Sequence, residues 1–318
     1  MSTTTSPRLT PTTVAGHKFA HRIVMAPMTR TRRTQPGNVP SAMNARHSQF
    51  KEQKTFVYRG STALITGASK GLGKVFAEVL AARGMNLVLV ARSGGALNTL
   101  AENLAARYGV QCVPLNADLG VPNAAIQIGE ELKRRRIQVD LLINNAGLGL
   151  TGSFLSHDLY KEQSAIQVNV QTVVALAHLF GNGMAERGTG GIINLASNAS
   201  FQPIPHMATY AATKAFVLYF SEALQFELAG TGVHVMAACP GPTATSFFDG
   251  VSTNVSPKDM DSAESVVQKT LKAFDQRKAV AYPGRSSVRA ATWLSRFLPR
   301  SLVVRLAAMA SDKMGLHG

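Results

Sequence analysis

The chain has little cysteine, little charge and no long apolar stretch. Its 318 residues include only Cys112 and Cys239 as cysteines, which excludes a disulfide framework and a cysteine-rich metal site. We therefore expect a reducing compartment, taken as the cytoplasm, and no metal. No run of about 18 consecutive apolar residues occurs, so no membrane-spanning helix is expected. Hydrophobic residues make up 45% and charged residues 16%, a balance that excludes disorder along the whole chain and indicates a sizeable core.

Acidic residues are scarce, at 18 against 33 Lys and Arg, for a net charge of +15. The excess of positive charge lies at the two ends, because residues 1–59 carry +9, residues 60–261 carry −1 and residues 262–318 carry +7. A nucleic-acid reader would instead carry a basic patch on its folded domain, so no nucleic-acid partner is expected. These shifts predict a basic N-terminal extension (1–59), one central domain (60–261) and a basic amphipathic C-terminal helical extension (262–318).

Short apolar runs alternate with longer amphipathic stretches from Ser61 onward. Runs without polar alternation are typical of strands buried on both faces of a parallel sheet. The alternation predicts a doubly wound, Rossmann-type α/β domain with helices on both faces of the sheet. The predicted strands are 63–65, 87–90, 110–114, 141–143, 191–195 and 233–237, and the predicted helices are 73–83, 96–108, 124–136, 164–180 and 210–229.

A glycine-rich turn follows the first predicted strand and leads into a helix. It reads Thr66-Gly67-Ala68-Ser69-Lys70-Gly71-Leu72-Gly73. Glycines allow a tight turn in which backbone N–H groups approach a phosphate, and the positive end of the helix dipole adds to the attraction. Because the turn lies between the first strand and the first helix, it predicts a dinucleotide site.

Two basic residues indicate which dinucleotide is bound. A domain that prefers NAD usually ends its second strand with an acid that holds the ribose 2′-hydroxyl. Arg92 occupies that place here, and Lys70 lies in the glycine turn. Two cations without a carboxylate suit a 2′-phosphate, with which Arg can form a bidentate pair. The alternative is two solvated surface charges, but the pattern favours NADP.

A tyrosine and a lysine lie four residues apart at the start of an apolar helical stretch, Tyr210-Ala211-Ala212-Thr213-Lys214. This spacing places both side chains on one helix face. A free tyrosine has a pKa of about 10, and a neighbouring ammonium favours the phenolate. Such pairs are also common on protein surfaces, so their meaning depends on the accompanying residues.

The accompanying residues form a series in a fixed order. Asp118 follows the third predicted strand, and Asn145-Ala146-Gly147 follow the fourth. Asn169 comes next, and Ser197 precedes Tyr210 by 13 residues. Pro240-Gly241 follow the sixth strand. Together with the glycine turn, these motifs resemble the classical short-chain dehydrogenase/reductase family over about residues 60–255.

The resemblance implies roles for four catalytic residues, Asn169, Ser197, Tyr210 and Lys214. Tyr210 would donate a proton to a substrate carbonyl oxygen, and Ser197 would hydrogen-bond the same oxygen. Lys214 would hold the nicotinamide ribose and lower the pKa of Tyr210, and Asn169 would keep a relay water behind Lys214. Alternatively, Asn169 caps or kinks a helix. Ser200 is a rival hydroxyl for Ser197, and His206 is interpreted as a pocket-rim residue.

The resemblance also implies a cofactor-binding set. Asp118 would contact the adenine amino group, although it could instead be a turn residue. Either Thr243 or Thr245 would hold the carboxamide or pyrophosphate. The full set is Gly67, Ser69, Lys70, Gly71, Leu72, Gly73, Arg92, Asp118, Leu119, Asn145, Ala146, Gly147, Tyr210, Lys214, Pro240, Gly241, Thr243 and Thr245.

Apolar loops are expected to surround the substrate. They are residues 200–207, 247–248, and 148–150 with Phe154, and in such a sheet they converge beyond the carboxyl ends of the strands. Their Phe, Met, Pro and Leu content predicts an apolar carbonyl or alcohol substrate. Ordinary loop packing is the alternative. An acyl thioester, a steroid, a retinoid and an aromatic ketone are not separated by this pattern.

The N-terminal extension carries a second resemblance. Residues 17–49, with Pro27-Met28-Thr29, are similar to the first strand and loop of an old yellow enzyme, a flavin-dependent barrel. Such a short piece cannot close an eight-stranded barrel, so we interpret it as a fusion remnant without an FMN site. The Arg- and Thr-rich composition also fits an organellar transit peptide.

The C-terminal extension ends in an amphipathic stretch at 286–318 with interleaved Arg. It could lie on an anionic membrane surface, cover the substrate cleft or pack on a partner subunit, and packing is favoured over peripheral membrane contact. The resulting hypothesis is an NADP-dependent carbonyl reductase or alcohol dehydrogenase that forms a homo-oligomer. The alternative function is a non-catalytic NADP(H)-binding sensor or scaffold.

Overall fold

The computed structural model of the chain describes residues 12–14, 17–19, 55–248, 254–295 and 297–316. The chain forms two compact units, Met1–Gln49 and Phe50–Gly318. In the first unit, β1 (Thr12–Val14) and β2 (His17–Phe19) pair as an antiparallel hairpin. Most of the segment that resembles an old yellow enzyme, including Pro27-Met28-Thr29, lies outside the described residues.

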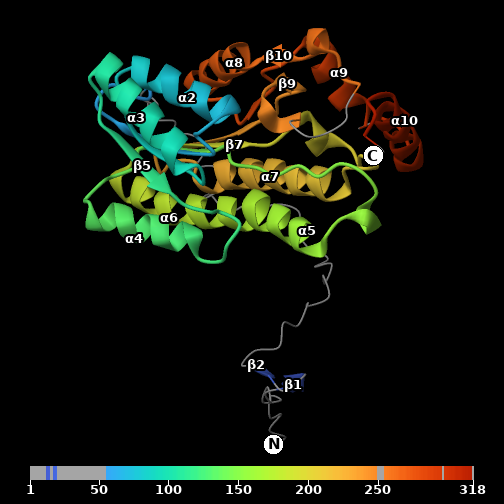
Figure 1. Cartoon of the computed structure of the whole chain (residues 1–318), viewed down its shortest axis with the longest axis horizontal. Coiled ribbons are helices and arrows are strands. Elements are labelled where there is room, and N and C mark those ends of the chain that lie inside the picture. Colours follow the sequence, from blue (N-terminus) through green and yellow to red (C-terminus); the bar gives the residue numbers. More distant parts are fainter. Residues whose placement is uncertain (1–11, 15–16, 20–54, 249–253, 296, 317–318) are drawn as a thin grey trace, which may run out of the picture. The chain divides into compact units, whose positions relative to one another are not determined.

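A seven-stranded parallel sheet forms the centre of the second unit (Figure 1). Its strands lie in the order β11-β8-β7-β6-β3-β4-β5, and each neighbouring pair is parallel. The predicted Rossmann-type fold is confirmed. The strands are β3 (Thr62–Thr66), β4 (Asn86–Ala91), β5 (Cys112–Asn116), β6 (Leu141–Asn144), β7 (Gly190–Leu195), β8 (Val233–Ala238) and β11 (Val280–Ala281).

Helices cover both faces of the sheet. One face carries α2 (Gly71–Ala82), α3 (Gly94–Tyr108) and α8 (Ala263–Asp275), and the other carries α4 (Ala124–Arg134), α6 (Thr172–Arg187) and α7 (Ala208–Glu227). Successive side chains of a strand point to opposite faces, so Ala63 and Ile65 of β3 pack in one core and Leu64 packs in the other. This two-sided burial explains why the strands read as continuous apolar runs.

A π-helical turn interrupts the helix predicted at 164–180. The structure has α5 (Leu159–Ile166), which begins where Asp158 accepts a hydrogen bond from Tyr160 N at 2.7 Å, then the π-helical turn Gln167–Gln171, and then α6. The wider turn contains Asn169, whose side chain is buried. π-helical turns occur often at functional sites.

The sheet domain continues past the boundary predicted at residue 261. Ser262 is the N-cap of helix α8, because its hydroxyl accepts a hydrogen bond from Ser265 N at 3.2 Å. Strand β11 pairs with β8 and forms one edge of the sheet. Phe274 of α8 fills the space beside Gly191 of β7, where a Cβ atom would collide with its ring. Residues 262–281 therefore complete the sheet domain, and only α9 (Ser286–Leu294) and α10 (Arg300–Lys313) follow as helices in the described part.

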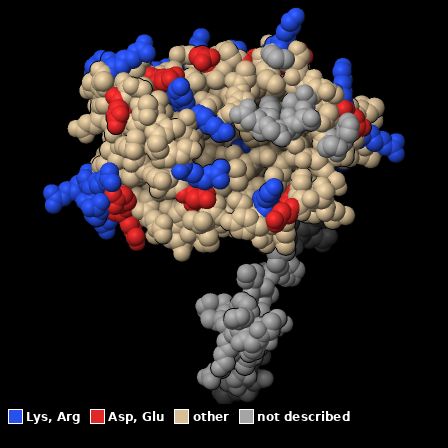
Figure 2. Space-filling view, in the orientation of Figure 1, with Lys and Arg blue, Asp and Glu red and all other residues tan. Residues whose placement is uncertain are grey.

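The surface of the described part mixes both signs of charge. On the face seen in Figure 2, Lys and Arg side chains are spread among Asp and Glu rather than gathered in one continuous patch. Within the described ranges, no helix combines the length and the hydropathy that a bilayer crossing requires.

Replacing Phe274 with Ala should lower the free energy of unfolding by about 3–5 kcal/mol, because the lost ring leaves a cavity between α8 and β7. Phe297 is 76% exposed and provides a matched control, for which Ala should cost less than about 0.5 kcal/mol. Urea unfolding followed by circular dichroism measures both variants. Equally small losses would contradict the assignment of α8 to the core.

Candidate active site

A cleft of about 630 Å³ lies along the loops that follow β3 to β8. Strand β3 lies between β4 and β6, so the strand order reverses beside it, and ligands of open α/β sheets bind at such a switch point. The predicted residues on its wall are Gly67, Ser69, Lys70, Gly71, Leu72, Arg92, Asp118, Leu119, Asn145, Ala146, Gly147, Ser197, Tyr210, Lys214, Pro240, Gly241, Thr243 and Thr245. Asn169 and Gly73 lie behind this wall.

The glycine turn after β3 has the shape that a phosphate cradle needs. Gly67 adopts φ +66°, which favours glycine, and a Cβ atom on Gly73 would collide with Gly67 O. Asn145 fastens the turn, because its Nδ2 donates to Thr66 O at 2.8 Å while Thr66 Oγ1 accepts from Asn145 N at 2.9 Å. Helix α2 begins at Gly71, so its free N–H groups lie beside the turn.

Two cations lie on the wall near this turn. Lys70 and Arg92 are both exposed on the cleft, and neither forms an ion pair with any residue of the described ranges. Asp118 lines the cleft and accepts from Gly120 N at 2.9 Å within its own turn, so it is a turn residue, and its contact with the adenine stays a prediction. The cradle fits the pyrophosphate of a nicotinamide dinucleotide.

Tyr210 lies near the start of α7, and the Ser197 side chain lies close enough to lower the pKa of its hydroxyl. Ser197 follows β7 and caps a short 3-10 turn, because its Oγ accepts from Ala199 N at 3.1 Å. The rival hydroxyl of Ser200 is buried and donates to Lys214 O at 2.8 Å. Ser200 therefore has a structural contact, and Ser197 is the hydroxyl on the cleft wall.

Burial controls the ionisation of the Tyr210–Lys214 pair. It raises the pKa of Tyr210 to about 12, partly offset by the neighbouring Ser197 side chain, and lowers the pKa of Lys214 to about 8. Lys214 Nζ donates to Leu195 O at 2.6 Å and lies 5.8 Å from the Tyr210 ring centre. The expected lowering of the Tyr210 pKa by Lys214 is thus corrected: desolvation of the phenolate prevails, and Tyr210 keeps its proton at neutral pH.

Asn169 connects three elements behind the cleft. Its Nδ2 donates to Leu148 O at 2.8 Å and to Thr213 Oγ1 at 3.0 Å, and its Oδ1 accepts from Leu148 N at 2.8 Å. A methyl group on Gly147 would lie 3.4 Å from both Asn169 Oδ1 and Lys214 Nζ. The π-helical turn therefore places Asn169 close to Lys214, where it fixes the loop after β6. Its relay water stays a prediction.

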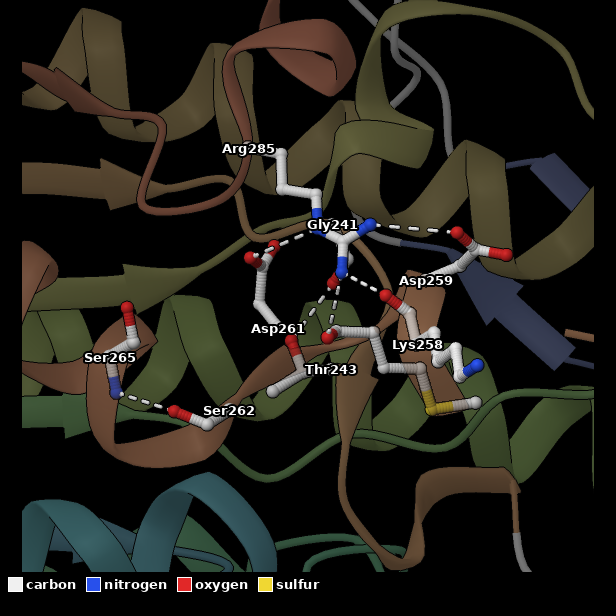
Figure 3. Close-up of polar contacts among 9 residues, drawn as sticks. Gly241, Thr243, Lys258, Asp259, Asp261, Ser262, Ser265 and Arg285 are labelled. Atoms are coloured by element: carbon white, nitrogen blue, oxygen red, sulfur yellow. Dashed lines mark hydrogen bonds and ion pairs between the residues drawn. The ribbon is translucent and has the colours of Figure 1, made fainter. Parts of the chain in front are cut away.

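The loop after β8 is stabilised by a hydrogen bond of its own, by a short strand pair and by contacts of Arg285 with one strand of that pair and the residues just before it. Thr243 Oγ1 donates to Gly241 O at 2.9 Å, and β9 (Thr243–Ala244) pairs with β10 (Asp261–Ser262). Figure 3 shows Arg285 reaching this segment: its guanidinium lies 3.8 Å from Asp261 Oδ1 and 3.5 Å from Asp259 Oδ1, and donates to the carbonyls of Lys258 and Met260. Thr245 lies beside Gly71, where a Cβ atom would be 3.3 Å from that of Thr245. Both threonines line the cleft, so the choice between them stays open.

The wall around Tyr210 is apolar. The predicted residues Leu148, Gly149, Ile204, Met207 and Phe247 lie there, and the Phe247 ring is 5.4 Å from that of Tyr210. Other predicted loop residues lie elsewhere: Phe201 stacks on Tyr282, whereas Leu150, Phe154 and His206 line a smaller pocket of about 200 Å³. The side chain of Phe248 lies outside the described ones.

Part of the cleft wall was not predicted from the sequence. Ala91, Ser93, Ala117, Val255, Met314 and Leu316 also line the cleft. The first three flank predicted residues, so a wider window would have found them. Met314 and Leu316 lie over a hundred residues from Tyr210, and the only signal for them was the amphipathic C-terminal stretch. No group of three or more His, Cys, Asp or Glu that could hold a metal occurs in the described part of the chain.

Comparison with known proteins gives a family match over the sheet domain. The model of the short chain dehydrogenase family matches residues 61–256. This match begins after residues 17–49, so their resemblance to an old yellow enzyme gains no support from it. The mouse very-long-chain 3-oxoacyl-CoA reductase is 31% identical over 221 residues, which cover 67% of this chain and 68% of the relative.

A second relative carries a different description. The human inactive hydroxysteroid dehydrogenase-like protein 1 is 33% identical over 196 residues, covering 59% of this chain. The matched part spans only 57% of that relative's length, and a similar 56% of its chicken counterpart. The chain thus spans little more than half the length of these curated relatives.

Solved structures share the fold over most of their length. A short-chain dehydrogenase from Sphingobium yanoikuyae in complex with NADPH has a TM-score of 0.68 and 33% identity, covering 76% of this chain and 97% of that one. A short chain dehydrogenase/reductase from Burkholderia phymatum in complex with NAD has a TM-score of 0.67 and 26% identity, covering 75% and 94%.

Replacing Gly73 with Ala should weaken dinucleotide binding at least tenfold, because the added Cβ pushes the backbone of Gly67 out of the cradle. Gly95 has no atom within 4 Å of its Cβ direction and lies in α3, so Gly95→Ala is a matched control that should bind normally. Titration of NADPH fluorescence measures both variants. If Gly73→Ala and Gly95→Ala bound NADPH equally well, the close approach of Gly73 to Gly67 O would not be the reason for glycine at position 73.

Proposed function

Because the chain belongs to the short chain dehydrogenase family, we propose that it is an NADP-dependent oxidoreductase that reduces apolar carbonyl compounds to alcohols. One observation carries the proposal: the buried Tyr210 lies on the cleft wall together with Ser197 and Lys214, beside the apolar side chains of Met207 and Phe247. A bound nicotinamide dinucleotide supplies a hydride to the carbonyl carbon.

The chain's own residues supply the proton and the positioning. Tyr210 stays protonated at neutral pH and donates its proton to the carbonyl oxygen as negative charge develops there. Ser197 hydrogen-bonds the same oxygen and fixes its place. Lys214 would hold the ribose hydroxyls of a bound dinucleotide and adds a positive charge beside the phenol. Asn169 keeps the loop after β6 in position against Lys214.

Replacing Tyr210 with Phe should reduce turnover by a factor of about 10²–10⁴, because the proton donor is lost while the ring still packs. Binding of NADPH should stay within about twofold of the unaltered protein. The measurement is NADPH oxidation at 340 nm with a panel of apolar ketones, aldehydes and 3-oxoacyl thioesters, with an NADPH titration alongside. Turnover retained by the Phe variant would contradict the role of Tyr210.

The preference for NADP rests on Lys70 and Arg92. Solved relatives include one with NADPH and one with NAD, so the fold alone does not decide between them. An exposed pair of cations without a carboxylate partner suits the additional phosphate.

Arg92→Ala should weaken NADPH binding about tenfold or more and leave NADH binding nearly unchanged, since a hydrogen bond to a charged group contributes about 1.5–3 kcal/mol. Arg107→Ala removes an exposed cation of the neighbouring helix α3 that is absent from the cleft wall, and serves as the control. The measurement is the dissociation constant of NADPH and of NADH for the unaltered protein and for each of the two variants. An equal loss for NADH and NADPH would remove Arg92 from 2′-phosphate recognition.

The apolar wall and two relatives support two candidate substrate classes. A 3-oxoacyl thioester is supported by the description of the mouse relative, and a steroid by that of the chicken hydroxysteroid dehydrogenase-like protein. The inactive human relative favours the second candidate function, a non-catalytic NADP(H) sensor. The assembled Ser197, Tyr210 and Lys214 favour catalysis, because a sensor needs no proton donor at the apolar wall.

The remaining proposals concern partners and placement. Helices α5 and α7 expose Leu159, Tyr160, Phe216, Tyr219 and Phe226, and an apolar surface of this kind suits a homo-oligomer. The exposed Trp293, Phe297 and Met309 beside several Arg residues suit peripheral contact with an anionic membrane as the less favoured option. We place the protein in the cytoplasm, with residues 1–59 as an extension derived from another protein.

A further inference from the structure

The segment that follows α10 reaches the catalytic tyrosine. Leu316 is 2% exposed and packs in one cluster with Ala199, Met207 and Tyr210. Met314 packs against the same cluster, and both residues line the cleft. The wall beside the proton donor is therefore built partly by a segment outside the matched family region, which ends at residue 256.

Three contacts fasten this segment. Gly315, at φ +73°, turns the chain at the end of α10, where Leu316 N donates to Ser311 O at 3.0 Å. Asn254 N donates to Met314 O at 2.8 Å, which ties the segment to the loop that carries Val255. Asp312 Oδ1 lies 3.8 Å from His206 Nε2. The segment at the end of α10 (Figure 1) is thus tied both to Asn254 and to the loop that carries His206.

The side chains around this segment are mainly apolar, so they would discriminate between substrates by size rather than by charge. Leu148, Ile204, Met207, Phe247 and Val255 complete the wall, and at this end no charged side chain of the described residues joins them except Lys214, next to Tyr210. A carbonyl oxygen held by Tyr210 and Ser197 would direct a hydrocarbon substituent along these residues.

We propose that Met314 and Leu316 determine specificity by limiting the length of the hydrocarbon chain that a carbonyl substrate carries past Tyr210. This inference rests on the proposed function, since it assumes that a carbonyl group binds at Tyr210. Leu316 forms the buried end of the wall, and Met314 forms its flexible side. Each methylene that fits should improve binding about fourfold until the chain reaches Leu316.

The test uses N-methyl alkanamides of increasing chain length, which present a carbonyl oxygen but are not reduced. Their dissociation constants are measured by calorimetry on the full chain saturated with NADPH. We expect affinity to rise with length and then to level off at a break. Leu316→Ala should move the break to chains about two carbons longer, and Leu316→Phe should move it to shorter chains.

Control variants separate this effect from general damage. Met309 lies on α10 and is 59% exposed, so Met309→Ala should keep the original break, whereas Met314→Ala should weaken binding of the longest chains that fit. Should Leu316→Ala prove unstable, Leu316→Val gives a smaller shift in the same direction. NADPH affinity should be equal in every variant, because the cofactor end of the cleft is unchanged.

The outcomes distinguish this inference from the proposed function. An unmoved break in folded Leu316→Ala and Leu316→Phe variants would overturn the inference, as would an absence of length dependence in the unaltered protein. The Tyr210→Phe variant should lose turnover and keep the break. A break that moves as expected in a protein that reduces no carbonyl compound would support the wall and contradict the reductase.

Discussion

The common direction of the seven strands is the constraint on which the site depends. Because every strand is parallel, the carboxyl ends of β3 to β8 meet at one edge, and the residues that follow them come together across more than 170 positions of sequence, from Gly67 to Thr245. The reversal of strand order beside β3 opens the crevice there. The parallel sheet thus determines where the cofactor-binding part of the cleft lies. The residues that follow each strand determine the chemistry of that part.

Desolvation then decides what the central residues do. Tyr210 and Lys214 lie one helical turn apart in α7, and both are buried. Burial disfavours the charged form of each group, so the phenol is held protonated and the pKa of the ammonium falls to about 8. The phenol therefore rests in its protonated form, which is the form that a proton donor to a carbonyl oxygen needs. A carbonyl oxygen entering this low-dielectric site meets two hydroxyl groups, those of Tyr210 and Ser197.

The sequence predicted the strands and the glycine turn, because both depend on residues that are close together in the chain. The strands at 63–65 and 191–195 were predictable because two-sided burial leaves continuous apolar runs, and the glycine turn because close approach needs glycine. The π-helical turn around Asn169 was foreseen only as the alternative that this residue kinks a helix, because a phase shift of one residue in a single turn is too brief to specify a π-helix. Strand β11 is only two residues long, too short to stand out. Met314 and Leu316 meet Tyr210 through tertiary folding alone. The pKa of Tyr210 depends on burial, which spacing to Lys214 does not report.

The central claim is that Tyr210 and a bound NADPH together reduce a carbonyl group on the apolar wall. The most direct measurement is mass spectrometry of the alcohol formed from an apolar ketone or 3-oxoacyl thioester with NADPH deuterated at C4. The account predicts one deuterium on the former carbonyl carbon, with transfer from only one face of the nicotinamide, and a rate of product formation in the Tyr210→Phe protein that is lower by a factor of about 10²–10⁴. An alcohol without deuterium, or NADPH that binds tightly and is never consumed across the panel, would contradict it.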